Sequence, residues 1–180
     1  MSTWRPAWLA LSLLLVLGGC GFQLRGSYTL PFDTLFIGIP EISELHAQIR
    51  RNVEAGSTTR VVPTSKDAAA VLSVVGDQPQ KNILSLDATG RVREFQLVRT
   101  FTFRINDAKG GEMLPTSQIV IRRDISFNDA QVLAKEAEEQ LLWRDIQSDL
   151  VQQLVRRLAA AKPAAPFPTK RIGEPTSGAK

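Results

Sequence analysis

The stretch Val92–Asn106, VREFQLVRTFTFRIN, decides the fold class of this chain. Its apolar side chains fall on alternate positions, which is the period of a β-strand with one buried face. The positions expected to be buried are Phe95, Leu97, Phe101, Phe103 and Ile105. The segment 119–127 repeats the alternation after a loop at 107–112 that contains two glycines. The two segments therefore predict an antiparallel hairpin.

Arg99 and Arg123 each interrupt the apolar parity of their strand. Two interpretations stay open. The apolar face ends at the arginine, or a bulge shifts the parity there. Alternatively, the guanidinium is held at a partner interface or an anion site. We expect the first arrangement.

Three further segments lie on the amino-terminal side of this hairpin. Residues 28–39 predict a strand that stops at a proline. Residues 43–55 predict a short amphipathic helix with Ser43 as N-cap and His46 on its surface or half-buried. Residues 68–75 are apolar and fit helix or strand; their β-branched residues favour a strand, and 81–87 could extend it past Pro79.

A long helix is expected after the hairpin, over residues 130–161, with Asn128 and Asp129 at its capping end. At 1.5 Å per residue it would be roughly 48 Å long, so we expect one end to project past the sheet. The predicted fold class is α+β: a two-layer sandwich in which a four-stranded, mostly antiparallel sheet carries two helices on one face.

The amino terminus predicts a lipoprotein signal over residues 1–19. Arg5 precedes an apolar run of 11 residues, 7–17, which is too short to span a bilayer as a helix. The run ends in Leu17-Gly18-Gly19-Cys20, which is similar to the bacterial lipobox, in which the cysteine is lipidated. A plain cleavable signal with an incidental cysteine is the alternative. We expect lipidation of Cys20, because it is the only cysteine and stands where that chemistry needs a thiol.

Charge and composition exclude several classes of function. The chain has 180 residues, 22 Lys and Arg against 18 Asp and Glu, one Cys and one His. It therefore has no internal disulfide, and a metal site of the usual His and Cys kind is not expected. Residues 20–161, the expected folded domain, have no net charge, while the Pro-rich tail 162–180 carries a net charge of +3. A neutral domain argues against nucleic-acid binding.

The search for chemistry finds no phosphate-binding loop and no nucleophile elbow, so we expect no enzymatic activity. A basic cluster remains: Arg91 and Arg93 lie next to the turn at Gly90. The cluster could bind phosphate groups. Ordinary surface charge is the alternative.

Several motifs resemble those of the LptE family of lipopolysaccharide-assembly lipoproteins. The segment Cys20-Gly21-Phe22-Gln23-Leu24-Arg25-Gly26 is similar to the start of the mature chain in that family. Glu94-Phe95-Gln96-Leu97 resembles its central strand. Phe127-Asn128-Asp129 and Leu133-Ala134-Lys135-Glu136 resemble the start of its last helix. The resemblance covers residues 17–160.

The resemblance implies an anchor in the outer membrane through acyl chains (palmitate among them) and diacylglycerol on Cys20, on the periplasmic side. It implies a roughly 1:1 complex with the β-barrel translocon LptD, which the domain would plug and help to assemble. It implies lipopolysaccharide binding, with Lys135 at the helix position and Arg91 and Arg93 near the turn, and no cofactor. The alternatives are an auxiliary lipoprotein of another lipid or ABC-type transport system and a lipid-anchored periplasmic enzyme.

Overall fold

The computed structural model describes residues 28–162. The predicted signal segment 1–19, Cys20 and residues 163–180 of the predicted tail lie outside the described residues.

The sheet has five strands, in the order β2-β1-β3-β4-β5. Their bounds are Thr34–Gly38 for β1, Arg60–Val61 for β2, Ala70–Leu86 for β3, Val92–Asp107 for β4 and Glu112–Ser126 for β5. β1 pairs in parallel with β2 and β3, whereas β3–β4 and β4–β5 are antiparallel. The α+β class and the hairpin of β4 and β5 are confirmed. The predicted count of four strands is wrong, because β2 has two residues and is too short to show a period.

β3 is one continuous strand of 17 residues, which resolves the ambiguity of its first half. Only Ala70–Ser73 pair with β1, so the remainder of β3 has a neighbouring strand on one side within residues 28–162. Pro79 lies in this remainder and pairs in register with Arg99. A strand with one free edge tolerates a proline there, because a missing N–H facing the free edge costs no ladder hydrogen bond.

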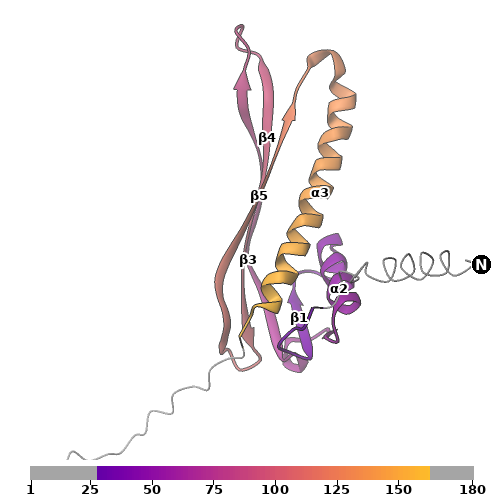
Figure 1. Cartoon of the computed structure of the whole chain (residues 1–180), viewed down its shortest axis with the longest axis vertical. Helices are drawn as coiled ribbons and strands as arrows, with labels where there is room; N and C mark the ends of the chain where they lie inside the picture. Colours follow the sequence, from indigo (N-terminus) through magenta and orange to yellow (C-terminus); the bar gives the residue numbers. More distant parts are fainter. Residues whose placement is uncertain (1–27, 163–180) are drawn as a thin grey trace, which may run out of the picture.

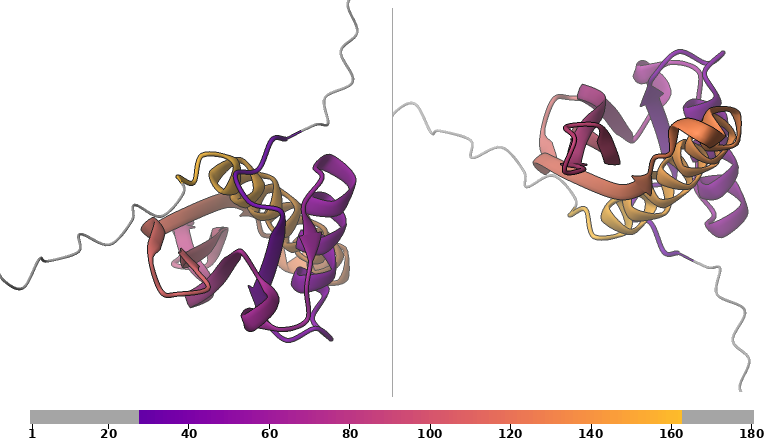
Figure 2. Two further views of the ribbon diagram at one scale, coloured as in Figure 1. Left: turned by 90° about the horizontal axis from the view of Figure 1, so that it is seen from below. Right: turned by 90° about the horizontal axis from the view of Figure 1, so that it is seen from above.

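The two helices, α2 (Glu44–Gly56) and α3 (Val132–Ala159), lie side by side on one face of the sheet (Figures 1 and 2). Ser43 caps α2 as predicted, since its hydroxyl oxygen accepts a hydrogen bond from the backbone N–H of His46 at 3.1 Å. His46 is more buried than predicted, because it lies three residues before Ile49 and seven before Val53 and so shares their packed face of the helix.

α3 runs along the long strands of the sheet rather than past them (Figure 1). Its 28 residues span roughly 42 Å. The predicted projection beyond the sheet is therefore wrong. The reason is that β3, β4 and β5 have 15 to 17 residues each and reach about as far as the helix.

The hydrophobic core lies in one half of the molecule. The buried residues of α3 run from Ile146 to Leu158 and face apolar residues of every long strand, such as Leu72, Phe103 and Ile119. No residue of α3 before Ile146 is buried. Before Ile146 the helix is held by the partly buried Leu142 and Trp143, which pack against the core, and by polar contacts of Lys135 and Glu139 to the sheet.

Arg99 and Arg123 attach the middle of α3 to the sheet. Arg99 donates two hydrogen bonds to Asp77, at 2.9 and 2.7 Å, and one to Gln147 of α3 at 3.2 Å. Arg123 donates to Asp145 at 2.9 Å and to Asp149, both on α3. These hydrogen bonds raise the pKa of the Arg123 guanidinium above its usual range, with the bond to Asp149 the largest cause.

Both expectations for these arginines are thereby corrected. The apolar face does not end at Arg99 or Arg123, since Phe101 and Ile125 continue it on the same parity and are buried. Arg99 pairs with Asp77 of β3 and reaches Gln147 of α3, and Arg123 pairs with two carboxylates of α3. These polar residues within an apolar strand face therefore add polar contacts to the apolar packing of the helix.

Candidate functional site

The candidate site lies at one end of the molecule, where the β3–β4 turn, the end of β5 and the start of α3 meet (Figure 1). We call this end the distal tip and define it as residues 81–95 and 125–139. It contains all three predicted basic residues, Arg91, Arg93 and Lys135. The fourth predicted site residue, Cys20, lies outside the described residues.

The turn that carries Arg91 is ordered by Asp87. One carboxylate oxygen of Asp87 accepts hydrogen bonds from the backbone N–H groups of Thr89 and Arg91, at 2.8 and 3.0 Å, and from the Thr89 hydroxyl at 2.6 Å. These contacts, the Thr89 hydroxyl foremost, hold the pKa of Asp87 well below its usual range. Gly90 has a φ of +81°, a conformation that favours glycine. The Asp87-Ala88-Thr89-Gly90 turn is thus fixed by its own side chain.

Arg91 is tied to this turn, whereas Arg93 is available to a ligand. The Nε of Arg91 donates to Asp87 at 3.2 Å and to the Thr89 hydroxyl at 3.1 Å. Arg93 is exposed, and its side chain has no ion pair within residues 28–162. Both arginines line an open cavity of about 340 Å³ with Asn128, Asp129 and Ala130, the residues that lead into α3.

Lys135 lies in the first turns of α3 with its side chain 17% exposed. Its ammonium group donates to the Ser126 hydroxyl and to Glu138, both at 2.9 Å. The lysine thereby joins α3 to the end of β5. Its partner on the helix is Glu138 at i+3 and not Glu139 at i+4.

Lys135 does not share a cavity with the two arginines. It lines a second cavity of about 220 Å³ together with Lys81, Phe95, Glu139 and other residues. Phe127 lines both cavities and packs edge-on against Phe95, with ring centroids 5.4 Å apart. The basic residues therefore lie in two neighbouring hollows on either side of one aromatic side chain.

Sequence reasoning missed Lys81 as a member of this site. Its Nζ lies 4.2 Å from the centroid of the Phe95 ring and 2.6 Å from a carboxylate oxygen of Glu139. A lysine over an aromatic face is stabilised by the ring quadrupole. The strand predicted past Pro79 could have identified Lys81. Ile83 pairs with Phe95, and Lys81 is two residues before Ile83, so its side chain lies on the same face of the strand as that of Ile83.

The distal tip also exposes large apolar side chains beside its basic groups. Leu133 is 84% exposed on α3. On β3 the exposed members are Ile83, Leu84 and Leu86. Monomeric soluble domains seldom gather several exposed aliphatic residues at one end without a binding role. The tip can therefore contact anionic groups and apolar chains at the same time.

The remaining chemistry of residues 28–162 is sparse. Within this part of the chain no group of His, Asp and Glu side chains is arranged to hold a metal ion. Nor does either of its helices have the length and apolar character that crossing a bilayer requires. The geometry on this part of the chain is that of a small binding domain with an amphipathic tip.

Comparison with known proteins shows which family has this architecture. The family described as LptE, Lipopolysaccharide-assembly, matches residues 32–158. The LPS-assembly lipoprotein LptE of Yersinia pestis (strain Pestoides F) is 28% identical over 164 residues, which are 89% of this chain and 78% of that protein.

Two solved structures have the same fold. The solution structure of an uncharacterized lipoprotein B from Nitrosomonas europaea has a TM-score of 0.68 and 38% identity, covering 78% of this chain and 91% of that one. The crystal structure of a minor lipoprotein from Acinetobacter baumannii has a TM-score of 0.62 and 26% identity, covering 76% and 99%.

The fold and the comparisons define an α+β lipoprotein domain of the lipopolysaccharide-assembly class. This chain belongs to the LptE family. The family is not enzymatic, which confirms that the chain is not an enzyme. Its basic tip residues are therefore candidates for binding and not for catalysis.

Proposed function

We propose that this protein is an outer-membrane lipoprotein, attached through acyl groups on Cys20, that forms a roughly 1:1 complex with the β-barrel LptD. In this proposal residues 20–161 form the domain that plugs the barrel and assists its assembly. The distal tip binds lipopolysaccharide on its way to the outer leaflet. Membership of the LptE family supports the assembly role.

The observation that carries the proposal is the amphipathic chemistry of the tip. Lipopolysaccharide presents phosphate groups next to acyl chains, so a binding surface needs cations beside apolar side chains. Arg93 offers a guanidinium with no ion pair in residues 28–162. The exposed Leu86 pairs with Val92, the residue before Arg93, and Leu133 is exposed elsewhere on the same tip. Charge-assisted hydrogen bonds from guanidinium to phosphate are among the stronger polar contacts that proteins make.

Lys135 contributes a second cation by a different route. A phosphate group carries more negative charge than a carboxylate and offers more acceptor oxygens. It can therefore replace Glu138 as the partner of the Lys135 ammonium, while Ser126 keeps the side chain in place. The neutral charge of residues 20–161 supports the plug role, since a strongly charged domain would need matching counter-charge in a polar barrel lumen.

Lipopolysaccharide binding is tested with single charge reversals at the tip. Lys135→Glu and Arg93→Glu are each expected to weaken binding of purified lipopolysaccharide about tenfold or more, because each replaces a phosphate contact by a repulsion. Lys109→Glu is the matched control: it makes the same charge change in the β4–β5 turn, away from the tip. Equal losses in all three variants would show that binding follows net charge, and the tip would not be the site.

The partnership is tested by purification of the tagged protein from outer membranes in mild detergent. Recovery of one large β-barrel protein in about 1:1 ratio is the expected result, and Cys20→Ala is expected to lower the yield in the membrane fraction. Recovery of inner-membrane transport subunits without a barrel would overturn the proposal and favour an auxiliary lipoprotein of an ABC-type transport system.

A further inference from the structure

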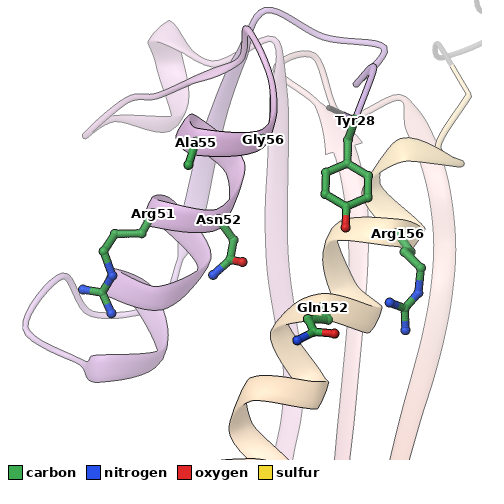
Figure 3. Close-up of a pocket in the computed structure, with 7 residues that line it drawn as sticks. All are labelled: Tyr28, Arg51, Asn52, Ala55, Gly56, Gln152 and Arg156. Atoms are coloured by element: carbon green, nitrogen blue, oxygen red, sulfur yellow. The ribbon is translucent and has the colours of Figure 1, made fainter. Parts of the chain in front are cut away.

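A second basic site lies at the other end of the molecule, in a cleft between α2 and α3. The cleft has a volume of about 430 Å³. Figure 3 shows Asn52 of α2 on the side of Gln152 of α3, the ring of Tyr28 beside Arg156, and Arg51 at the outer rim of α2 with its guanidinium directed away from α3. It is the largest of the cavities described above, and it shares no lining residue with the distal tip.

The chemistry of this cleft suits an anion. Its polar lining consists of two guanidinium groups, two carboxamides and a phenol, and no carboxylate is among the lining residues. Neither Arg51 nor Arg156 forms an ion pair within residues 28–162. The Asn52 amide is already used, since it donates to the carbonyl oxygen of Gln48 at 2.8 Å. Arg156, with Gln152 and the Tyr28 hydroxyl beside it, is a suitable donor set for a phosphate group, and Arg51 at the rim adds a second unpaired positive charge.

The charge along α3 changes sign between its two halves. Residues 132–149 contain acids in excess, including Glu136 and Asp145. Residues 150–162 contain Arg156, Arg157 and Lys162 and no acidic residue. The carboxyl-terminal end of α3 therefore carries a local excess of positive charge beside the cleft.

The cleft lies close to the point where the folded domain joins its amino-terminal segment. The backbone N–H of Tyr28 donates to the carbonyl oxygen of Gly56 at 2.6 Å, which fixes the chain at the edge of the cleft. Tyr28 is eight residues after Cys20. A fully extended segment of that length reaches at most about 29 Å. If Cys20 is lipidated, the cleft can therefore lie no farther than that from the anchored residue.

We propose that the cleft between α2 and α3 binds the phosphate of an anionic lipid headgroup in the leaflet that holds the anchor. Arg156 contacts the phosphate oxygens, Gln152 and the Tyr28 hydroxyl donate to the rest of the headgroup, and Arg51 adds positive charge at the α2 rim of the cleft. The inference rests on the proposed anchoring at Cys20 for the source of the ligand. Headgroup binding would orient the domain relative to the membrane, with the distal tip pointing away from the surface.

Vesicle binding by the mature chain, residues 20–180, tests this proposal. Cys20→Ala removes the acyl anchor, so that only the protein surface can bind. Co-sedimentation with phosphatidylglycerol–phosphatidylcholine vesicles is compared with co-sedimentation with phosphatidylcholine alone. One arginine near an anionic surface changes binding about fivefold, so the pair Arg51→Gln with Arg156→Gln is expected to lower the partition coefficient about 25-fold.

The matched control is the pair Arg60→Gln with Arg157→Gln, which removes the same charge from exposed arginines that do not line the cleft. A fall in the partition coefficient of fivefold or less in the control pair, with a fall of about 25-fold in the cleft pair, supports a defined site. Equal losses in the two pairs would show diffuse attraction to the surface and would overturn the proposal.

A titration with inorganic phosphate separates the two sources of the anion. Changes in the NMR signals of Gln152 on addition of anionic vesicles, with none at about 10 mM phosphate, support a lipid headgroup. Saturation by free phosphate together with unchanged vesicle binding in the cleft pair would assign the site to a soluble phosphate and overturn the lipid source. The vesicle assay contains neither lipopolysaccharide nor a barrel, so a negative result would not count against the proposed function. Whether Cys20 is lipidated is decided separately, by mass spectrometry of the protein from membranes.

Discussion

Replacing Arg123 by glutamine should loosen the attachment of the middle of α3 to the sheet while leaving the core intact. The Arg123 side chain is 31% exposed, and those of Asp145 and Asp149 are 56% and 39% exposed, so both ion pairs are screened by solvent. Pairs of this kind contribute about 0.2–1 kcal/mol each. Loss of both should therefore lower the free energy of unfolding by about 1 kcal/mol.

Two measurements check this magnitude. With a slope of about 2 kcal/mol per M urea for a domain of this size, the midpoint of urea unfolding should fall by about 0.5 M. Amide hydrogen exchange in residues 132–145 should accelerate about fivefold, because these residues precede the attachment point and only Leu142 and Trp143 among them pack, partly buried, against the core. Exchange near Leu154, which is fully buried, requires global unfolding and should accelerate by about the same factor from a slower rate.

Arg122→Gln is the matched control, since Arg122 is exposed, adjacent in sequence and without an ion pair in residues 28–162. Ile146→Ala provides the opposite comparison: it removes a fully buried side chain and should cost about 2–5 kcal/mol. A loss in Arg123→Gln as large as in Ile146→Ala would refute the reasoning, because the arginine would then belong to the core. So would unchanged exchange in residues 132–145.

Three further predictions concern local structure. Hydrogen bonds to the Asp87 carboxylate depress its pKa, so the β3–β4 turn should stay ordered below about pH 3.9, the ordinary pKa of an aspartate. The turn should lose its order only as the pH falls through the depressed pKa. NMR signals of Thr89 followed against pH check this, and Asp87→Asn should abolish the transition. Gly38→Ala places a Cβ 2.8 Å from the carbonyl oxygen of Leu72 on the neighbouring strand, so it should destabilise the domain by about 1–3 kcal/mol, and an unchanged melting temperature would contradict this contact. Ser43→Ala removes the N-cap of α2 and should cost about 1 kcal/mol in urea unfolding, with Ser43→Gly costing less.

Local patterns predicted those elements whose burial repeats along the chain. The alternation around Phe101 and Ile121 identified the β4–β5 hairpin, because each strand has one buried face. The hydroxyl of Ser43 before an amphipathic run identified the start of α2. β2 could not be found in this way, since two residues that pair with β1 have no period of their own.

The candidate site was predictable only in part, for a related reason. Arg91, Arg93 and Lys135 stand next to recognisable turns and helix starts, so their positions follow from local structure. The partners of Arg99 and Arg123 are on α3, 22 to 48 residues away along the chain, and no local pattern encodes that pairing. The division of the tip into two cavities depends on the Phe127 ring, whose orientation is a result of tertiary packing.

The unequal distribution of stabilising contacts fits a protein with different tasks at its two ends. Apolar burial is concentrated from Ile146 to Leu158, so that half of α3 is rigid and keeps the cleft residues Gln152 and Arg156 in fixed positions. The residues before Ile146 are attached through the partly buried Leu142 and Trp143 and through polar contacts of Lys135 and Glu139 to the sheet. Such polar contacts break at a cost of about 1 kcal/mol each and can be exchanged for contacts to a ligand. A tip built in this way can rearrange around phosphate groups and acyl chains without disturbing the core that supports it.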